Sequence, residues 1–433
     1  FQDGVSHYLS THEYGNTETS DLWDRIEESN PATPVRALMD SWIWQAGYPL
    51  VSARLDGTQL VLSQQRFAYG DTDDPTVFVV PVHLLINGEA SKVLLDGADL
   101  RVELSSTEST VVVNAGGHGY FRVAYDATLR ARLLGSALPM LTVIDRYNLV
   151  DDAWNEVVAG RLAAADFLTF AEGFAGDREL AVWQAIAIGL RSIGRLVEGD
   201  ALEAFRTRVT ALVGPALADL GWQPAAGESD LTAKLRGLHV GLLAVLGNDT
   251  DAQQRCRDLV GTATDPELVA AATNAIAAVG TDADYDHYLE RFRNPTTPQE
   301  ELRYMYALAE FPTRDQIDRT IALAWSGEVR TQNAPFLLNR CIANRWNGEH
   351  AWQEVRKHWD DANEKFPNNT IVRMIDTVKL LTTPTVVADV QSFFSEHPIP
   401  QAAKTLDQVL ERQRTNAALA AREAERLSAA LRG

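Results

Sequence analysis

The chain opens with apolar residues spaced three and four positions apart, which is the pattern of amphipathic helices. Three such stripes precede residue 48, and Pro34 stands where the missing amide hydrogen of proline suits a first helical turn. The stripes are Val5, Tyr8 and Leu9; Leu22, Trp23 and Ile26; and Val35, Leu38, Met39 and Trp42. The sequence therefore predicts a short helical segment over residues 1–48, which ends at Gly47-Tyr48-Pro49.

Between residues 49 and 127 the apolar pattern changes to the strict alternation of β-strands. The turn pairs Asp56-Gly57, Asn87-Gly88 and Asp96-Gly97 separate these runs and favour tight hairpins. Seven strands are expected, at 50–55, 59–66, 76–86, 92–95, 100–104, 109–114 and 119–125. Seven short strands with these turns predict a small all-β sandwich.

From residue 128 to the C-terminus the strand pattern disappears, and short helical stripes recur between clusters of Asp, Asn, Gly and Pro. This predicts an all-α array of antiparallel helix pairs that is similar to irregular HEAT or armadillo arrays. The last helix is expected to close the array through Leu406, Val409 and Leu427. The predicted fold is multidomain: a short α segment (1–48), a β-sandwich (49–127) and an α-superhelical domain (128–433).

Net charge and cysteine content limit which partners and which cellular location are expected. The formal net charge of −20 argues against a nucleic-acid partner, because phosphate binding draws on clustered Lys and Arg. The two cysteines, Cys256 and Cys341, lie in apolar helical patterns and are expected to be reduced core thiols of a cytoplasmic protein. No long apolar run or signal peptide is present, so no membrane association is expected. Abundant Ala and only six Lys are typical of GC-rich bacterial genomes.

Catalytic chemistry is difficult to find in this chain. A zinc motif His-Glu-x-x-His would place two His on one helical face, but the nearest match is His12-Glu13-Tyr14-Gly15-Asn16. His83 and His118 have no second ligand near them in sequence. We therefore predict no catalytic residue and no metal ligand. Gly116-Gly117-His118-Gly119 is expected to be a hairpin turn, and acidic pairs such as Asp151-Asp152 and Asp360-Asp361 to be solvated helix ends. Core packing is predicted for seven tryptophans: Trp42, Trp44, Trp183, Trp325, Trp346, Trp352 and Trp359.

Several motifs together indicate a family. Phe1, Gly4 and Tyr8 fit an F-x-x-G-x-x-x-Y helix; Tyr14, Asn16-Thr17 and Asp21-Leu22-Trp23 follow; then come Trp42, Gln45 and Gly47-Tyr48-Pro49 in a W-x-x-Q-x-G-Y-P pattern. Three later stretches match too: VNAGGHGYFRVAYD (113–126), DRYNLVDDAW (145–154) and VRTQNAPFLLNRCIANRWNGEHAW (329–352). Taken together, the chain resembles the carboxyl-terminal half of the aminopeptidase N family of zinc metallopeptidases.

The resemblance implies that residues 1–48 are the last helices of a thermolysin-like catalytic domain, whose zinc ligands, general base and oxyanion-stabilising Tyr precede Phe1. The parent enzyme would remove N-terminal residues from peptides, with this chain as its brace and lid. We expect the chain to bind no zinc, to be inactive by itself, and to have the upstream catalytic domain and peptide substrates as partners. The family suggests Arg330, Gln332, Asn333 and Asn344 as cavity residues, although the family commonly carries an acid where Asn333 stands.

Two alternatives to these assignments remain. Arg330 and Gln332 could simply join neighbouring helices. The whole chain could also be a non-catalytic helical-repeat scaffold that binds a protein partner. The apolar faces predicted within residues 1–48 favour the enzyme, because they need a catalytic domain to cover them.

Overall fold

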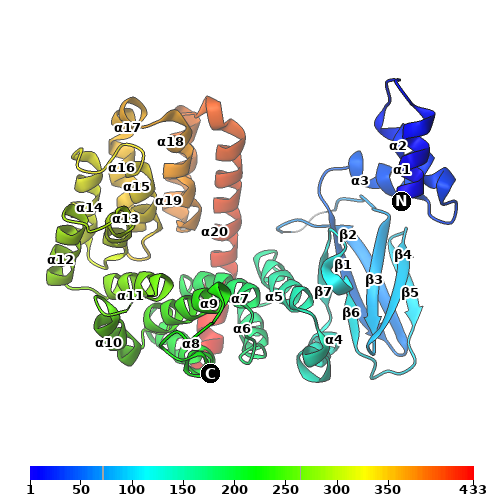
Figure 1. Ribbon diagram of the computed structural model, residues 1–433, viewed down its shortest axis with the longest axis horizontal. Coiled ribbons are helices and arrows are strands. Elements are labelled where there is room, and N and C mark those ends of the chain that lie inside the picture. Colours follow the sequence, from blue (N-terminus) through cyan, green and yellow to red (C-terminus); the bar gives the residue numbers. More distant parts are fainter. Residues whose placement is uncertain (71–72, 264) are drawn as a thin grey trace. The chain divides into compact units, whose positions relative to one another are not determined.

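The computed structural model describes residues 1–70, 73–263 and 265–433, which form two compact units, Phe1–Ala159 and Gly160–Gly433 (Figure 1). The first unit begins with three helices, as predicted: α1 (Gln2–Thr11), α2 (Thr19–Ser29) and α3 (Val35–Ile43). Helices α1 and α2 pack closely because Gly4 has no side chain. A Cβ atom at Gly4 would lie 2.7 Å from the Cα of Ile26.

Among the described residues, seven strands follow, and they form two sheets with the orders β5-β2-β1-β7 and β4-β3-β6. Strands β1 and β7 pair in parallel, whereas the other neighbours are antiparallel. The strands are β1 (Pro49–Asp56), β2 (Gln59–Arg66), β3 (Val80–Ile86), β4 (Glu89–Leu95), β5 (Asp99–Glu103), β6 (Val111–Val113) and β7 (Arg122–Tyr125). Inward residues such as Leu60, Phe78 and Val82 are fully buried, as expected of two sheets that share one core.

The turn predictions were only partly correct. Asn87-Gly88 joins β3 to β4 in a hairpin, and both residues have the positive φ that a type I′ turn requires. By contrast, Asp96-Gly97 leads from β4 to β5, which lie in different sheets. Likewise, residues 116–119 do not form a hairpin, because β6 and β7 belong to different sheets and the short 3₁₀ helix η1 (Ala115–Gly117) stands between them.

The predicted strand at 76–86 begins only at Val80, because side chains occupy the backbone groups before it. Gln64 bonds both the N–H and the C=O of Phe78, at 3.0 and 2.7 Å. Trp42 donates its indole N–H to the carbonyl of Val79 at 2.9 Å, and Gln45 donates to the carbonyl of Val77 at 3.2 Å. The Trp and Gln of the W-x-x-Q pattern thus attach α3 to the sandwich.

After β7 the first unit is helical: α4 (Ala127–Arg132), the π-helical turn η2 (Leu133–Ala137), the 3₁₀ turn η3 (Leu138–Met140) and α5 (Val143–Val158). Thr142 and Asp145 form a capping box that fixes the start of α5. Asp151 and Asp152 lie inside α5 and pair with Arg122, so the prediction of a solvated helix end was wrong for them. Asp360 and Asp361 do lie in the first turn of a helix, α17 (Trp359–Lys365).

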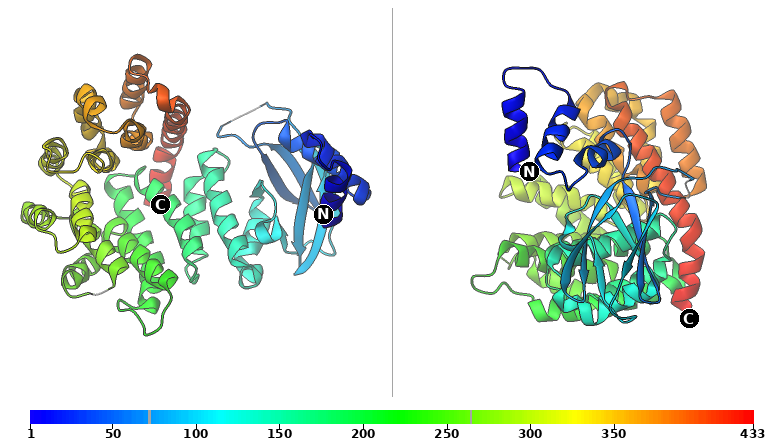
Figure 2. Two further views of the ribbon diagram at one scale, coloured as in Figure 1. Left: turned by 45° about the horizontal axis from the view of Figure 1, so that its top comes forward. Right: turned by 90° about the vertical axis from the view of Figure 1, so that its right-hand side faces the viewer.

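The second unit is an array of helices, all within the described residues (Figure 2). Thr or Asp side chains cap several of them, for example Thr281 on α12 and Asp249 on α10. The α-helices are α6 (Ala164–Glu172), α7 (Leu180–Gly194), α8 (Gly199–Leu220), α9 (Asp230–Gly241), α10 (Thr250–Leu259), α11 (Pro266–Ala278), α12 (Asp282–Arg293), α13 (Pro298–Ala307), α14 (Arg314–Trp325), α15 (Ala334–Ala343), α16 (Gly348–Lys357), α17 (Trp359–Lys365), α18 (Asn368–Met374), α19 (Pro384–Glu396) and α20 (Ala403–Arg432). Tighter or wider turns interrupt them at η4 (Leu242–Leu246), η5 (Leu308–Glu310), η6 (Asp376–Leu380) and η7 (Pro400–Ala402).

The last helix returns to the first helices of its unit. Helix α20 packs on η6 and α19 and then against α8 and α6 (Figure 1). Its Glu423, 1% exposed, accepts a hydrogen bond of 2.8 Å from the backbone N–H of Ala164 at the start of α6. The array is therefore closed on itself by its C-terminal helix.

The structure bears on the predictions for the cysteines, the tryptophans and the domain boundaries. Cys256 and Cys341 are buried and unpaired with each other, as predicted. Core packing is confirmed for Trp183, Trp352 and Trp359 but is wrong for Trp44 and Trp346, which are 70% and 53% exposed. The division into domains 1–48, 49–127 and 128–433 stays a prediction, since the compact units separate instead after Ala159.

Candidate functional site

The four residues suggested as cavity residues lie just before and just after α15 in the chain, and they differ in solvent exposure. Arg330 is 64% exposed and forms an ion pair of 3.3 Å with Glu301. Gln332 is exposed, and Asn333 is the N-cap residue of α15, whose side chain makes no capping hydrogen bond. The backbone carbonyl of Arg330 accepts the N–H groups of Asn333 and Ala334, at 2.8 and 3.0 Å. This turn therefore presents three polar side chains at the start of α15.

Asn344 is not part of that exposed group. It is 5% exposed, and its amide nitrogen donates to the carbonyls of Ala309 and Phe311 at 2.9 and 3.0 Å. Its amide oxygen accepts the N–H groups of Trp346 and Asn347, each at 3.0 Å. Both ends of the side chain are thus used within the chain, and Asn344 holds the turn between α15 and α16.

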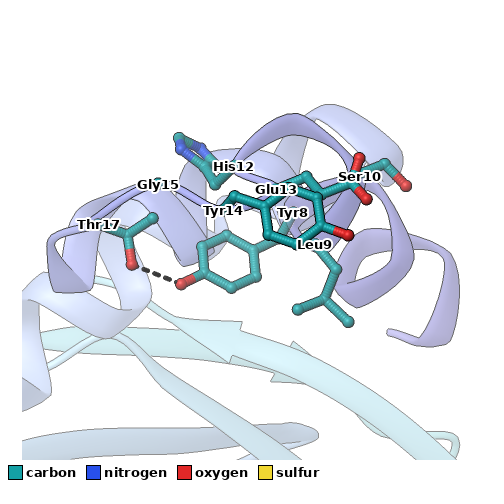
Figure 3. Close-up of a pocket in the computed structure, with 8 residues that line it drawn as sticks. All are labelled: Tyr8, Leu9, Ser10, His12, Glu13, Tyr14, Gly15 and Thr17. Carbon is teal, nitrogen blue, oxygen red and sulfur yellow. Dashed lines mark hydrogen bonds between the residues drawn. The ribbon is translucent and has the colours of Figure 1, made fainter.

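A hollow of about 590 Å³ lies at the C-terminal end of α1. Figure 3 shows the hydroxyl of Tyr8 directed at Thr17, to which it bonds at 2.6 Å, while His12 projects away from them. Tyr14 is fully exposed and has a positive φ of 58°, an uncommon conformation for a bulky residue. The Nε2 atom of His12 has no hydrogen-bond partner among the described residues. The hollow combines aromatic and polar groups but contains no triad of nucleophile, base and orienting acid.

Within 1–70, 73–263 and 265–433, no group of three or more His, Cys, Asp and Glu side chains could hold a metal ion. The imidazoles of His83 and His118, distant in sequence, do lie together, with ring centroids 5.0 Å apart. Burial, followed by the charges of Lys92 and His118, lowers the pKa of His83. Two His without a third ligand do not fit a zinc site.

Sequence reasoning missed an arginine-rich cluster that joins the ends of α7 and α15. Arg195 donates to the carbonyl of Ala343, and Arg345 donates to that of Val197 at 2.9 Å, each across 148 residues of sequence. Burial lowers the pKa of Arg195, and it lowers that of Arg345 to about 10. These reciprocal bonds satisfy carbonyls at two helix ends. No local signal could have found them, because the partners are so far apart along the chain.

Across the part of the chain that the structure describes, none of the helices has the length and apolarity needed to cross a bilayer.

Comparison with known proteins gives a consistent result. Residues 110–415 match the family model described as the ERAP1-like C-terminal domain. Aminopeptidase M1 of Arabidopsis thaliana is 29% identical over 454 residues, which cover 96% of this chain and 51% of that protein. The alanine/arginine aminopeptidase of Saccharomyces cerevisiae is 24% identical, with 100% and 52% covered. The tricorn protease-interacting factor F2 of Thermoplasma volcanium is 26% identical, with 82% and 44% covered. The chain thus spans about half the length of these relatives.

Proposed function

This chain is the C-terminal part of an enzyme of the aminopeptidase N family, and we propose that it serves a zinc-dependent aminopeptidase as the brace and lid of the active site. The observation that carries the proposal is coverage: nearly all of this chain aligns with aminopeptidases, but with only about half of each. The zinc and the reacting groups are assigned to the part of the relatives that this chain does not cover.

The surface of α1–α3 supports a catalytic domain as the partner of this chain. Leu9, Tyr14 and Trp44 are 61%, 100% and 70% exposed, although they lie on or beside amphipathic helices. Large apolar side chains that are exposed to this extent favour burial against another protein surface. In our proposal, the zinc-bearing domain covers them, and the sandwich holds α3 in place through Trp42 and Gln45.

The helical array contributes the lid, and its irregular helix pairs are proposed to follow the HEAT-like pattern of a curved array. Within it, Arg330, Gln332 and Asn333 are proposed to contact peptide substrates. A guanidinium can bind a peptide carboxylate through two parallel hydrogen bonds. The single ion pair of Arg330 with Glu301 is exposed and therefore weak, which leaves the guanidinium available to exchange partners. Asn344 is excluded from this role because its side chain is buried and fully bonded.

The proposal includes a cytoplasmic location, supported by two buried thiols that form no disulfide. Burial raises the pKa of the Cys256 thiol to about 12, so it stays protonated and unreactive at neutral pH.

The test uses the complete polypeptide that contains this chain. Hydrolysis of an aminoacyl chromogenic substrate and of peptides of increasing length is measured with and without a zinc chelator. Activity that is lost with the chelator and restored by zinc supports the enzyme. A complete polypeptide that releases no N-terminal residues from any peptide would overturn it and favour a scaffold that binds a protein partner.

The lid role is tested separately with Arg330→Ala. We expect KM to rise several-fold for longer peptides and to stay constant for the chromogenic substrate. The matched control is Arg293→Ala, which removes an arginine of similar exposure from another ion pair with a glutamate, Glu328. Unchanged length preference in Arg330→Ala would remove Arg330 from the substrate path without affecting the assignment of the enzyme.

A further inference from the structure

A second hollow, of about 280 Å³, lies in the helical array, remote in sequence from α15. It is formed by the connection between α6 and α7, the last turns of α8, and α9. Its walls are largely apolar, with Ala175, Pro215, Ala216, Leu220 and Leu235 contributing to them. A buried histidine, His239, is the one polar residue of the lining that is almost completely enclosed, with 1% exposure.

The imidazole of His239 has hydrogen-bonding groups that the described residues leave unused. Neither Nδ1 nor Nε2 has a hydrogen-bond partner among them, and both are covered by neighbouring atoms, so a ligand reaches the ring nitrogens only by displacing part of the lining. The neighbouring indole of Trp183, with its centroid 4.3 Å away, cannot help, because its N–H already donates to the carbonyl of Asp177 at 2.8 Å. Burial lowers the pKa of His239 to about 4, so at neutral pH the ring has one donor and one acceptor. Buried polar groups are normally satisfied, so these atoms need an explanation.

Neither the fold nor bulk water supplies that explanation. Helix α9 continues directly into the π-helical turn η4, three residues after His239, and such turns are frequent at functional sites. A single bound water would occupy only a small part of this volume, and the apolar walls offer further waters few partners. At the rim, Arg178 and Asp219 form an exposed ion pair and neutralise each other. The third charged residue of the lining, Asp177, accepts the backbone N–H of Glu179 at 2.9 Å. The lining therefore offers no unpaired cation to an anionic ligand.

We propose that this hollow binds a small, uncharged, mainly apolar molecule that carries one hydroxyl group, with the hydroxyl bonded to His239. A hydroxyl both donates and accepts, so it can meet either nitrogen of a neutral imidazole. The size of the molecule follows from the volume: an apolar cavity of about 150 Å³ binds benzene, so this larger hollow admits a substituted ring. The site is independent of the proposed peptidase role, because its lining contains none of the proposed substrate-contacting residues and it needs no zinc.

Phenol is the probe, and toluene is its control, since toluene has the same number of non-hydrogen atoms but no hydroxyl. Binding to the complete polypeptide is measured by ligand-observed NMR titration. We expect a dissociation constant for phenol of about 1 mM or below, in the range of small fragments. Toluene should bind at least about tenfold more weakly, because it leaves the imidazole unpaired.

Three variants locate the interaction. His239→Phe keeps a ring against Trp183 and should remove the preference for phenol over toluene. Ala216→Trp fills the hollow and should abolish binding of both probes. Ala181→Phe, at an exposed position of α7 outside the lining, should change neither.

The proposal is overturned if wild-type protein binds neither probe, if it binds both equally, or if phenol binding survives Ala216→Trp. A loss of binding counts only for variants that keep the wild-type circular dichroism spectrum and unfolding temperature within a few degrees. If His239→Phe fails to fold, His239→Gln, which keeps polar groups, provides the same comparison between phenol and toluene. Equal binding of phenol and toluene to the wild type would still refute the role of His239.

Discussion

Arg122 at the start of β7 and Asp152 in the middle of α5 form an ion pair of 2.9 Å. The same guanidinium lies 2.7 Å from Asp151, and the second oxygen of Asp152 accepts the N–H of Val123 at 3.0 Å. Burial alone would lower the pKa of Arg122, but its two carboxylate partners raise it above its ordinary value. The last strand of the sandwich is therefore joined to α5 by charges largely removed from water.

Arg122→Ala should destabilise the protein by about 3–5 kcal/mol, because it leaves two partly buried carboxylates without their cation. The measurement is chemical denaturation of the complete polypeptide, followed by circular dichroism. Arg101→Ala is the control: its ion pair with Asp56 is half exposed and should contribute less than about 1 kcal/mol. Equal, small losses in both variants would contradict a structural role for the pair.

Asn344→Ala should cost about 3 kcal/mol, because two carbonyls and two N–H groups lose a buried partner. Arg330→Ala should leave thermal stability nearly unchanged, because its ion pair is exposed. Differential scanning fluorimetry of both variants checks this contrast. A stable Asn344→Ala protein would mean that water or a rearranged turn replaces the amide.

Gly348→Ala should destabilise the start of α16 by about 2 kcal/mol. An added Cβ would lie 2.4 Å from the backbone carbonyl oxygen of Ile342, which cannot move independently of its helix. The opposite result is expected for Gly241→Ala, where φ and ψ are helical and no atom lies within 4 Å of the new Cβ. That change should stabilise the protein by about 0.5–1 kcal/mol. Opposite shifts in unfolding temperature are the predicted outcome.

His239 should make the protein sensitive to mild acid. Its pKa in the folded state is about 4, below the ordinary value of 6.5, so the unfolded state binds the proton more readily between these values. Stability should therefore fall as the pH decreases through this window, by at most about 3 kcal/mol. Denaturation of wild type and His239→Phe at pH 7 and pH 4.5 should show the smaller acid loss in the variant. His287→Gln, at an exposed position, should behave as wild type.

Local signals explain which parts of the fold were predictable. Asn87-Gly88 marks its hairpin because the two central residues of a type I′ turn need positive φ, a conformation that Asn and Gly adopt readily. Thr281 and Asp249 mark helix starts through bonds that span only three residues. In contrast, the strand before Val80 was overestimated, because the side chain of Gln64 replaces a neighbouring strand at Phe78. Alternation of apolar residues shows that a segment is buried, but it does not show what pairs with its backbone.

The suggested cavity residues and the tryptophans likewise depend on contacts that a sequence pattern does not show. Motif resemblance pointed to both Arg330 and Asn344, yet the first is exposed and the second is enclosed in a turn. Helical spacing among apolar neighbours gave Trp44 and Trp346 the same expectation as Trp352. The indole of Trp352 is buried and donates to Asp389, whereas the exposed indole of Trp44 donates to Asp40 on its own helix. These differences depend on contacts between residues distant in sequence, which no local pattern encodes.

The return of α20 to α6 and α8 has a consequence for synthesis of the chain on the ribosome. In an open array, each helix pair can complete its packing as soon as its neighbour emerges. Here the N–H of Ala164 finds its acceptor, Glu423, only once α20 has been made. The faces of α6 and α8 that pack on this thirty-residue helix stay uncovered until then. Helices α6 and α8 therefore complete their packing only after α20 has left the exit tunnel, so a chain that is terminated before α20 leaves their faces uncovered.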